Sequence, residues 1–219
     1  MSERKIELML ACVNYARFLD ITLPINRDKF DNIIIITTPE DKDTQNVCIK
    51  NKVDCYLTDI FYKNGAVFDR GSAFNLIFPR LKYKSWIALT DPDIIFQDDF
   101  REKLNLDDLN SGNMYGGTRY FVKTYNDWLD YKTGVKKLTD FENIVGWGCG
   151  FLQIFDYNSP KISNKSIIYP YSQQFVEADI WFLKVFHPDV RDVGKLPIDV
   201  IHLGDHGKYG KPEENGFFR

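Results

Sequence analysis

The sequence predicts one α/β domain in which helices flank a mixed, largely parallel sheet. Residues 6–59 alternate between strand-like and helix-like segments, a pattern typical of parallel strands joined by right-handed helical crossovers. The chain has 219 residues, of which 44% are hydrophobic and 27% charged, so it can bury the core of a single domain. The alternation weakens beyond residue 93, which indicates a second half with a different strand arrangement.

The first half contains the clearest elements. The β-branched run NIIIITT is the strongest strand signal in the chain. A helix is expected after Pro39, because an acidic first turn follows this proline. Another helix is expected to begin at Ser72, whose hydroxyl suits an N-cap. The full prediction is strands at 6–13, 32–38, 53–59 and 85–90, helices at 14–27, 39–52 and 72–82, and a loop at 61–71.

The second half mixes strands with glycine-interrupted segments. The runs NMYGGTRYFVKTY and GWGCGFLQIFDY have strand-like composition, and VEADIWFLKVFH has a helical pattern. IDVIHLG reads as a late strand that leads into a tail rich in glycine, lysine and histidine. These segments occupy residues 113–125, 146–157, 176–187 and 198–204, and neither a repeat nor a clear linker divides the chain.

Composition argues against several classes of protein. The formal net charge of -3 does not favour a nucleic-acid binder. No apolar run approaches the roughly 18 residues of a membrane span, and the N-terminus lacks the pattern of a signal peptide. The cysteines show no C-x-x-C spacing, so we expect reduced core thiols and a cytoplasmic location. They are Cys12, Cys48, Cys55 and Cys149.

Two aspartates directly follow the fourth predicted strand. Asp91 and Asp93 flank Pro92 between two apolar runs, at the end of a strand where open α/β sheets place their ligands. Charged carboxylates beside buried strands cost free energy unless they are paired or bind a metal. Carboxylates together with phosphate oxygens are what Mg²⁺ or Mn²⁺ prefers. A simple turn is the alternative, because Asp and Pro both favour turns.

A second D-x-D, Asp41-Lys-Asp43, provides a contrast within the same chain. It lies in a polar helix start with no apolar run around it. We therefore expect both of its carboxylates to be solvated in a first turn, where the helix dipole stabilises them.

The order of these features resembles the GT-A glycosyltransferases. The resemblance rests on the strand-helix alternation, the aspartate pair after the fourth strand, and a late histidine. It implies one Rossmann-like domain over 1–219, with a nucleotide-sugar-binding half at 1–96 and an acceptor-binding half at 97–219. It further implies a metal-dependent enzyme that transfers a sugar from a nucleotide-sugar, UDP-sugar being the first expectation, to a hydroxyl acceptor, with inversion as the first expectation and retention as the alternative.

The resemblance also implies roles for residues in the first half. Asp91 and Asp93 match the family's ligands for Mn²⁺ or Mg²⁺, and the metal in turn binds the donor diphosphate. In DRGSAFN, Arg70 matches a donor contact and Asn75 a residue that faces the donor site from its helix; a surface ion pair with Asp69 is the alternative for Arg70. The segment that would hold the nucleotide base comprises Val13, Asn14, Tyr15 and Thr37.

In the second half, FVEADIWF resembles the acidic pair beneath the acceptor. Asp179 is the expected general base that removes the acceptor hydroxyl proton, with Glu177 as the second choice. Trp147, beside Gly148, is an expected acceptor platform, since aromatic rings stack on sugar faces; a core tryptophan is equally consistent.

The tail supplies the remaining expected contacts. His202 ends a strand and matches the family's third metal ligand, while His206 in the following loop is the alternative. Lys208 and Lys211 would contact the donor diphosphate as mobile point charges.

Two other functions fit parts of this pattern. A nucleotidyltransferase shares the alternating fold and the metal, but normally has a glycine-rich basic loop after the first strand, which CVNYARF lacks. A noncatalytic module that binds a sugar or nucleotide would not need the complete set of Asp91, Asp93 and His202. The acceptor stays open between a glycan and a hydroxymethylated DNA base.

Overall fold

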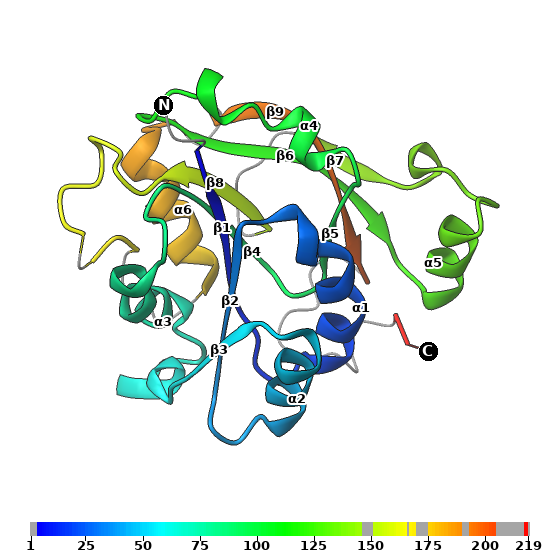
Figure 1. Ribbon diagram of the computed structural model, residues 1–219, viewed down its shortest axis with the longest axis horizontal. Coiled ribbons are helices and arrows are strands. Elements are labelled where there is room, and N and C mark those ends of the chain that lie inside the picture. Colours follow the sequence, from blue (N-terminus) through cyan, green and yellow to red (C-terminus); the bar gives the residue numbers. More distant parts are fainter. Residues whose placement is uncertain are drawn as a thin grey trace.

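A nine-stranded mixed sheet organises the computed structural model (Figure 1), which describes residues 4–145, 151–165, 167–169, 175–189, 193–204 and 217–218. The strand order is β3-β2-β1-β4-β8-β6-β9-β5, and β7 pairs with β6. The strands are β1 (Ile6–Ala11), β2 (Asn32–Thr37), β3 (Asp54–Leu57), β4 (Trp86–Thr90), β5 (Ile94–Phe96), β6 (Met114–Val122), β7 (Asn143–Val145), β8 (Leu152–Asp156) and β9 (Gly194–Leu203).

Helices cover both faces of this sheet. The α-helices are α1 (Ala16–Asn26), α2 (Lys42–Asn51), α3 (Arg70–Ile77), α4 (Phe100–Lys103), α5 (Tyr125–Lys132) and α6 (Phe175–Phe186). Short 3-10 helices η1 to η5 span Arg27–Lys29, Ile60–Gly65, Phe78–Arg80, Leu106–Asp108 and Leu138–Asp140. The predicted class, a mixed α/β sheet flanked by helices, is confirmed.

Two hydrophobic cores lie on opposite faces of the sheet. Helices α1 and α2 pack on one face through Leu19, Leu23 and Val47. Helices α3 and α6 pack on the other through Phe74 and Phe182. Figure 1 shows the same division, with α1 and α2 close together and α3 and α6 on the other side. This burial of apolar surface on both faces is the main term that stabilises the fold.

The strand directions bring several strand ends to one edge. Strands β1, β2, β3 and β4 are parallel, and β8 is antiparallel to β4. Strand β6 is antiparallel to β8, whereas β9 is parallel to β6. The carboxyl end of β9 therefore lies at the same edge as the carboxyl ends of β1, β2 and β4. Open α/β sheets bind their ligands at such an edge.

A buried carboxylate fixes the turn that leads into β4. Glu7 of β1 is fully buried and accepts hydrogen bonds from the backbone amides of Lys82, Tyr83 and Lys84, at 2.8 to 3.0 Å, and from Asn32. A buried charge is tolerated when it is hydrogen-bonded in this way. The start of β4, and with it the position of the residues that follow, is thereby tied to β1.

The structure corrects several predicted elements. The helix that was expected to start at Ser72 begins at Arg70, because Asp69 is the N-cap and accepts from the Ser72 amide at 3.0 Å. Residues 61–71 were expected to be a loop, but 60–65 form the 3-10 helix η2. Helix α5 was missed, although Thr124 caps it by accepting from the Asp127 amide.

Candidate active site

The turn after β4 is held on two sides. On one side, Thr22 of α1 donates from its hydroxyl to the Pro92 carbonyl at 2.7 Å. On the other, the Leu203 amide of β9 donates to the Asp93 carbonyl at 3.0 Å. The turn is closed by the Ile94 amide, which bonds to the Asp91 carbonyl at 3.4 Å. The D-P-D segment is therefore a turn with fixed neighbours at the carboxyl end of a buried strand.

Asp93 and His202 face each other across the β5–β9 pair. His202 Nε2 lies 3.4 Å from Asp93 Oδ2, because Ile94 pairs directly with His202 in the sheet. Both side chains are largely buried, with 8% and 12% exposure. Among the described residues, neither Asp93 Oδ1 nor His202 Nδ1 has a hydrogen-bond partner. Buried polar atoms normally have partners, so each of these two residues has one atom left for a further group.

The donor set at this point suits a divalent metal. A carboxylate oxygen and an imidazole nitrogen are ligands that Mn²⁺ accepts. The third expected ligand, Asp91, has its carboxylate turned to Arg70, and no cluster of three His, Cys, Asp or Glu side chains suited to a metal is found in the described part of the chain. The residues fit a metal held by two protein ligands, with the remaining positions left for ligand oxygens and water.

Arg70 joins two carboxylates on the other side of the turn. Its Nη1 donates to Asp91 Oδ1 at 2.7 Å, and its Nη2 forms an ion pair with Asp179 Oδ1. Arg70 and Asp179 are buried, whereas a third of the Asp91 side chain is exposed. Burial raises the pKa of the Asp91 carboxyl to about 6 against the lowering effect of Arg70, and Asp93 contributes to the rise. Arg70 is therefore not a surface arginine. Its carboxylate partners are Asp91 and Asp179, and not Asp69.

Tyr169 completes this buried network. Its hydroxyl donates to Asp179 Oδ1 and lies 3.5 Å from Gln153 Oε1. Burial, and the Asp179 carboxylate beside it, raise the pKa of Tyr169 well above its ordinary value, so the phenol keeps its proton. Neither Tyr169 nor Gln153 was expected from the sequence. The short-range pattern around them contains no motif, and only the fold brings residue 169 to residue 179.

The Asn75 side chain, expected at the donor site, is bonded to the backbone of Ile168 and Tyr169. Its side-chain oxygen accepts from the amides of Ile168 and Tyr169 at 2.9 and 2.8 Å, and its nitrogen donates to the Tyr169 carbonyl at 2.7 Å. All three bonds fix the backbone that carries Tyr169. Asn75 therefore braces the buried network, because its amide group matches the donors and acceptors of an extended backbone.

The expected base-binding segment lies at the same edge of the sheet, after β1 and β2. Asn14 is exposed and has a left-handed backbone (φ 60°), which Asn adopts more readily than most residues. Val13 and Tyr15 are half-buried, and Tyr15 stacks on Phe18. Thr37 is fully buried and donates to Asp41 Oδ2 at 3.1 Å. Thr37 thus holds the Asp41 side chain, which in turn bonds to the Asn14 amide.

Asp41 is not the solvated residue that its sequence context predicts. It is 7% exposed, caps α2 by accepting from the Thr44 amide, and also accepts from the Asn14 amide at 2.7 Å. One carboxylate therefore joins the ends of β1 and β2 to the start of α2. Only Asp43 is exposed as predicted.

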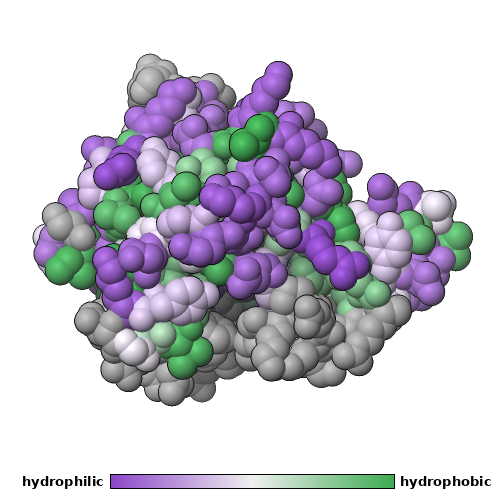
Figure 2. Space-filling view, turned by 90° about the horizontal axis from the view of Figure 1, so that it is seen from below, coloured by the Kyte–Doolittle hydropathy of each residue, from purple (hydrophilic) through white to green (hydrophobic). Residues whose placement is uncertain are grey.

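Several predicted site residues lie outside the described residues. These are Trp147, Gly148, His206, Lys208, Lys211 and the side chain of Glu177. The described part of the site is polar, because it contains the carboxylates of Asp91, Asp93 and Asp179 and the Tyr169 hydroxyl. Figure 2 views the molecule from the side toward which β1 and β2 run in Figure 1, and hydrophilic side chains cover much of the described surface there.

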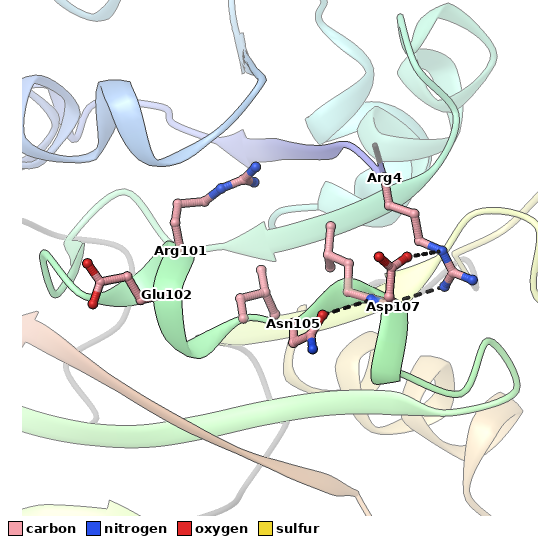
Figure 3. Close-up of a pocket in the computed structure, with 7 residues that line it drawn as sticks. Arg4, Arg101, Glu102, Asn105 and Asp107 are labelled. Atoms are coloured by element: carbon pink, nitrogen blue, oxygen red, sulfur yellow. Dashed lines mark hydrogen bonds and ion pairs between the residues drawn. The ribbon is translucent and has the colours of Figure 1, made fainter. Parts of the chain in front are cut away.

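A separate pocket lies at the opposite edge, where the strands begin (Figure 3). It has a volume of about 370 Å³ and is formed by α4, η4 and Arg4. Arg4 is paired with Asp107 at 3.0 Å, and Arg101 with Asp31 at 3.3 Å. Because its lining includes none of Asp91, Asp93 and His202 and it lies at the other edge of the sheet, this pocket is not the expected diphosphate site.

The three described cysteines are reduced, as expected, and Cys149 lies outside the described residues. Cys12 and Cys48 are buried and free, and Cys55 is half-buried and free. Burial raises the pKa of Cys12 to about 12, so this thiol keeps its proton and is a poor nucleophile. In the described residues, no helix is long and apolar enough to cross a membrane.

Comparison with known proteins gives likeness in structure alone. No protein-family model matches the sequence, and no curated protein matches it. Glucosyl-3-phosphoglycerate synthase from Mycobacterium tuberculosis, solved with Mn²⁺, UDP and glucosyl-3-phosphoglycerate, aligns with a TM-score of 0.57 and 12% identity over 97% of this chain and 75% of that one.

Two further structures of that enzyme align equally well. The complex with Mn²⁺ and UDP-glucose has a TM-score of 0.58 and 12% identity, and covers 98% of this chain and 75% of that one. The complex with Mn²⁺, UDP-glucose and phosphoglyceric acid has a TM-score of 0.57 and 11% identity, with 98% and 76% covered. At such identities the likeness shows the fold. The chain therefore has the GT-A-like fold that its sequence predicts, with a mixed α/β sheet flanked by helices.

Proposed function

We propose that the protein is a metal-dependent glycosyltransferase that moves a sugar from a nucleotide-sugar, first of all a UDP-sugar, to a hydroxyl acceptor. The observation that carries the proposal is the pairing of Asp93 with His202 at the carboxyl edge of the sheet, with one buried atom of each lacking a partner. The similar structures support it, since they were solved in complex with Mn²⁺ together with UDP or UDP-glucose.

In this proposal Asp93 and His202 hold Mn²⁺ or Mg²⁺, and Asp91 borders the site. A bound divalent metal supplies positive charge that stabilises the diphosphate as it leaves. Arg70 contributes a second cation, kept in place by Asp91 and Asp179. Its planar fork can bind phosphate or sugar oxygens while one nitrogen stays anchored, which a lysine could not do.

Asp179 is the candidate base of an inverting reaction, provided that one of its oxygens can reach the acceptor hydroxyl. Its Oδ1 accepts from both Arg70 and Tyr169, so this oxygen is already engaged. To take a proton from an acceptor hydroxyl, the carboxylate must use its other oxygen or exchange a partner. The same contacts favour a second role, in which Asp179 anchors Arg70 and the sugar is transferred with retention.

The acceptor follows less directly from the residues. A glycan or a modified DNA base stays a prediction, whereas one similar structure was solved with phosphoglyceric acid, a small anion. A cytoplasmic location also stays a prediction. Of the other functions, a nucleotidyltransferase normally has a glycine-rich basic loop after β1, whereas residues 12–18, CVNYARF, contain no glycine and continue directly into α1.

The test is donor turnover across a panel of nucleotide-sugars. Purified protein is incubated with each donor in Mn²⁺, in Mg²⁺ or in EDTA, and release of the nucleoside diphosphate is measured without an added acceptor. We expect metal-dependent hydrolysis of at least one UDP-sugar, because donor hydrolysis is the background reaction of such enzymes. Release that is equal in EDTA, or binding of every donor without turnover, contradicts the proposal and favours a noncatalytic binding module.

A further inference from the structure

Helix α1 presents two buried polar side chains to the segment that carries the candidate metal ligands. Thr22 and Asn26 are 1% and 3% exposed, and they lie four residues apart, so both face the same side of the helix. Thr22 donates to the Pro92 carbonyl at 2.7 Å. Asn26 donates to the Ile94 carbonyl at 2.8 Å and accepts from the Phe96 amide at 3.0 Å.

These bonds pair three backbone groups along one edge of the segment. Strand β5 is the last strand of the sheet, and its other edge pairs with β9. An edge strand leaves backbone groups without a neighbour, and buried groups of this kind need partners. Thr22 and Asn26 supply these partners at residues 92, 94 and 96, so α1 takes the place of a missing strand.

We propose that Thr22 and Asn26 are positioning residues for the candidate metal site, Thr22 by fixing the D-P-D turn and Asn26 by fixing β5. Neither side chain touches the metal. Thr22 bonds to the residue between Asp91 and Asp93, while the Leu203 amide bonds to Asp93 from the opposite side. The turn is clamped between α1 and β9, and the clamp sets the position of the Asp93 carboxylate opposite His202. The part that concerns the metal rests on the proposed function.

Thr22→Val tests this with minimal change of shape. Valine keeps the volume and removes the hydroxyl, while Thr22→Ser keeps the hydroxyl. We expect Thr22→Val to weaken Mn²⁺ binding roughly 10-fold, as is usual when a residue that orients a metal ligand is lost, and Thr22→Ser to restore most of it. Mn²⁺ affinity is measured from the electron paramagnetic resonance signal of free Mn²⁺, with and without UDP, well below the melting temperature.

A matched control separates positioning from stability. Ser159 also has a buried hydroxyl, 2% exposed, which accepts from the Lys161 amide in the turn after β8. Ser159→Ala should lower the melting temperature without changing Mn²⁺ affinity. If Thr22→Val changes only the melting temperature, as Ser159→Ala does, the positioning proposal is wrong.

Amide hydrogen exchange without metal provides the readout that does not depend on the proposed function. The amides of Asp93 and Ile94 should exchange faster in Thr22→Val than in the wild type, while those of β4 stay protected. Asn26→Asp, which loses the donor to Ile94, should loosen β5 in the same way. Wild-type protein that binds no Mn²⁺ would reject the metal site, and unchanged exchange at 93–94 would reject the clamp itself.

Discussion

Arg70 Nη1 lies 2.7 Å from Asp91 Oδ1, so the first aspartate of the D-P-D turn is paired with a buried cation. The second aspartate, Asp93, faces His202 instead. Two carboxylates one residue apart therefore have different partners and different surroundings. This division makes it possible to test the two sides of the candidate site separately.

The Arg70 side is tested through stability. Arg70→Ala leaves the buried Asp179 carboxylate without its cation, and we expect a loss of about 3–5 kcal/mol, the scale for breaking a buried ion pair. Urea unfolding measures it. Lys50→Ala removes an exposed pair with Asp20 and should cost less than about 1 kcal/mol. Equal losses in the two variants would mean that the buried Arg70 ion pairs contribute no more to the free energy of unfolding than an exposed pair does.

The Asp93 side is tested through metal dependence. Asp93→Asn and His202→Asn should each lower Mn²⁺-dependent donor turnover by about 100-fold or more, because each removes a ligand, and EDTA should do the same to the wild type. The folded protein should persist, as circular dichroism can verify. Asp98→Asn is the control, since Asp98 is fully exposed and pairs only with Lys29 in the described residues. Wild-type turnover in EDTA would contradict the metal role.

The role of Asp179 is decided by comparing binding with transfer. Asp179→Asn keeps the size of the side chain and an oxygen that can accept from Arg70. We expect UDP affinity to be retained and transfer to fall by about 10²-fold or more, the scale for loss of a general base. Calorimetry measures the affinity, and NMR of the product anomer reports inversion or retention. If affinity falls as much as transfer, Asp179 anchors Arg70 and is not a base.

Asp31 gives a prediction for pH. Burial alone would raise the pKa of Asp31, but the Ile6 amide at 2.8 Å, Lys5 and Arg101 outweigh it and lower this pKa below the ordinary value. A carboxyl with a lowered folded-state pKa adds stability above its unfolded pKa and loses it as the pH falls through the folded value. Asp31→Asn should therefore destabilise at pH 7 by about 1–3 kcal/mol.

This difference should shrink as the pH falls. Wild type and Asp31→Asn are compared by urea unfolding at decreasing pH, from pH 7 to below about 3.9, the ordinary pKa of an unfolded Asp, because the contribution of the charge is lost as the folded carboxyl takes up its proton. A difference that stays constant over this range would show that the loss is one of packing and not of charge.

The early strands and helices could be predicted because their signals are local. NIIIITT contains enough β-branched residues to specify β2 without any tertiary information, and Pro39 with its acidic turn marks the start of the next helix. His202 was placed correctly at the end of a strand for the same reason. Its position opposite Asp93 depends on the antiparallel pairing of β5 with β9, which no local pattern specifies.

The contacts that the sequence did not predict share a physical cause. Asp41, Asn75 and Thr22 are polar residues in predicted helical segments; Asp41 was expected in solvent, Asn75 at the donor site, and Thr22 was not singled out. Each is instead directed at backbone from a distant part of the chain: Asn14, Tyr169 and Pro92. Hydrogen bonds of this kind are set by tertiary contacts, so their residues can be recognised only after the sheet order is known.

The pairing of β5 with β9 also determines when the site can form. Among the described residues, 94–96 are joined in the sheet only to 200–202, more than a hundred positions later, whereas β1, β2, β3 and β4 pair among themselves within the first ninety residues. Contacts so distant in sequence are slow to form, and a nascent chain folds from its N-terminal part first. During synthesis the parallel half can assemble early, but the Asp93 carboxylate meets His202 only when the last strand has been made. The candidate metal site thus forms only after β9 has paired with β5.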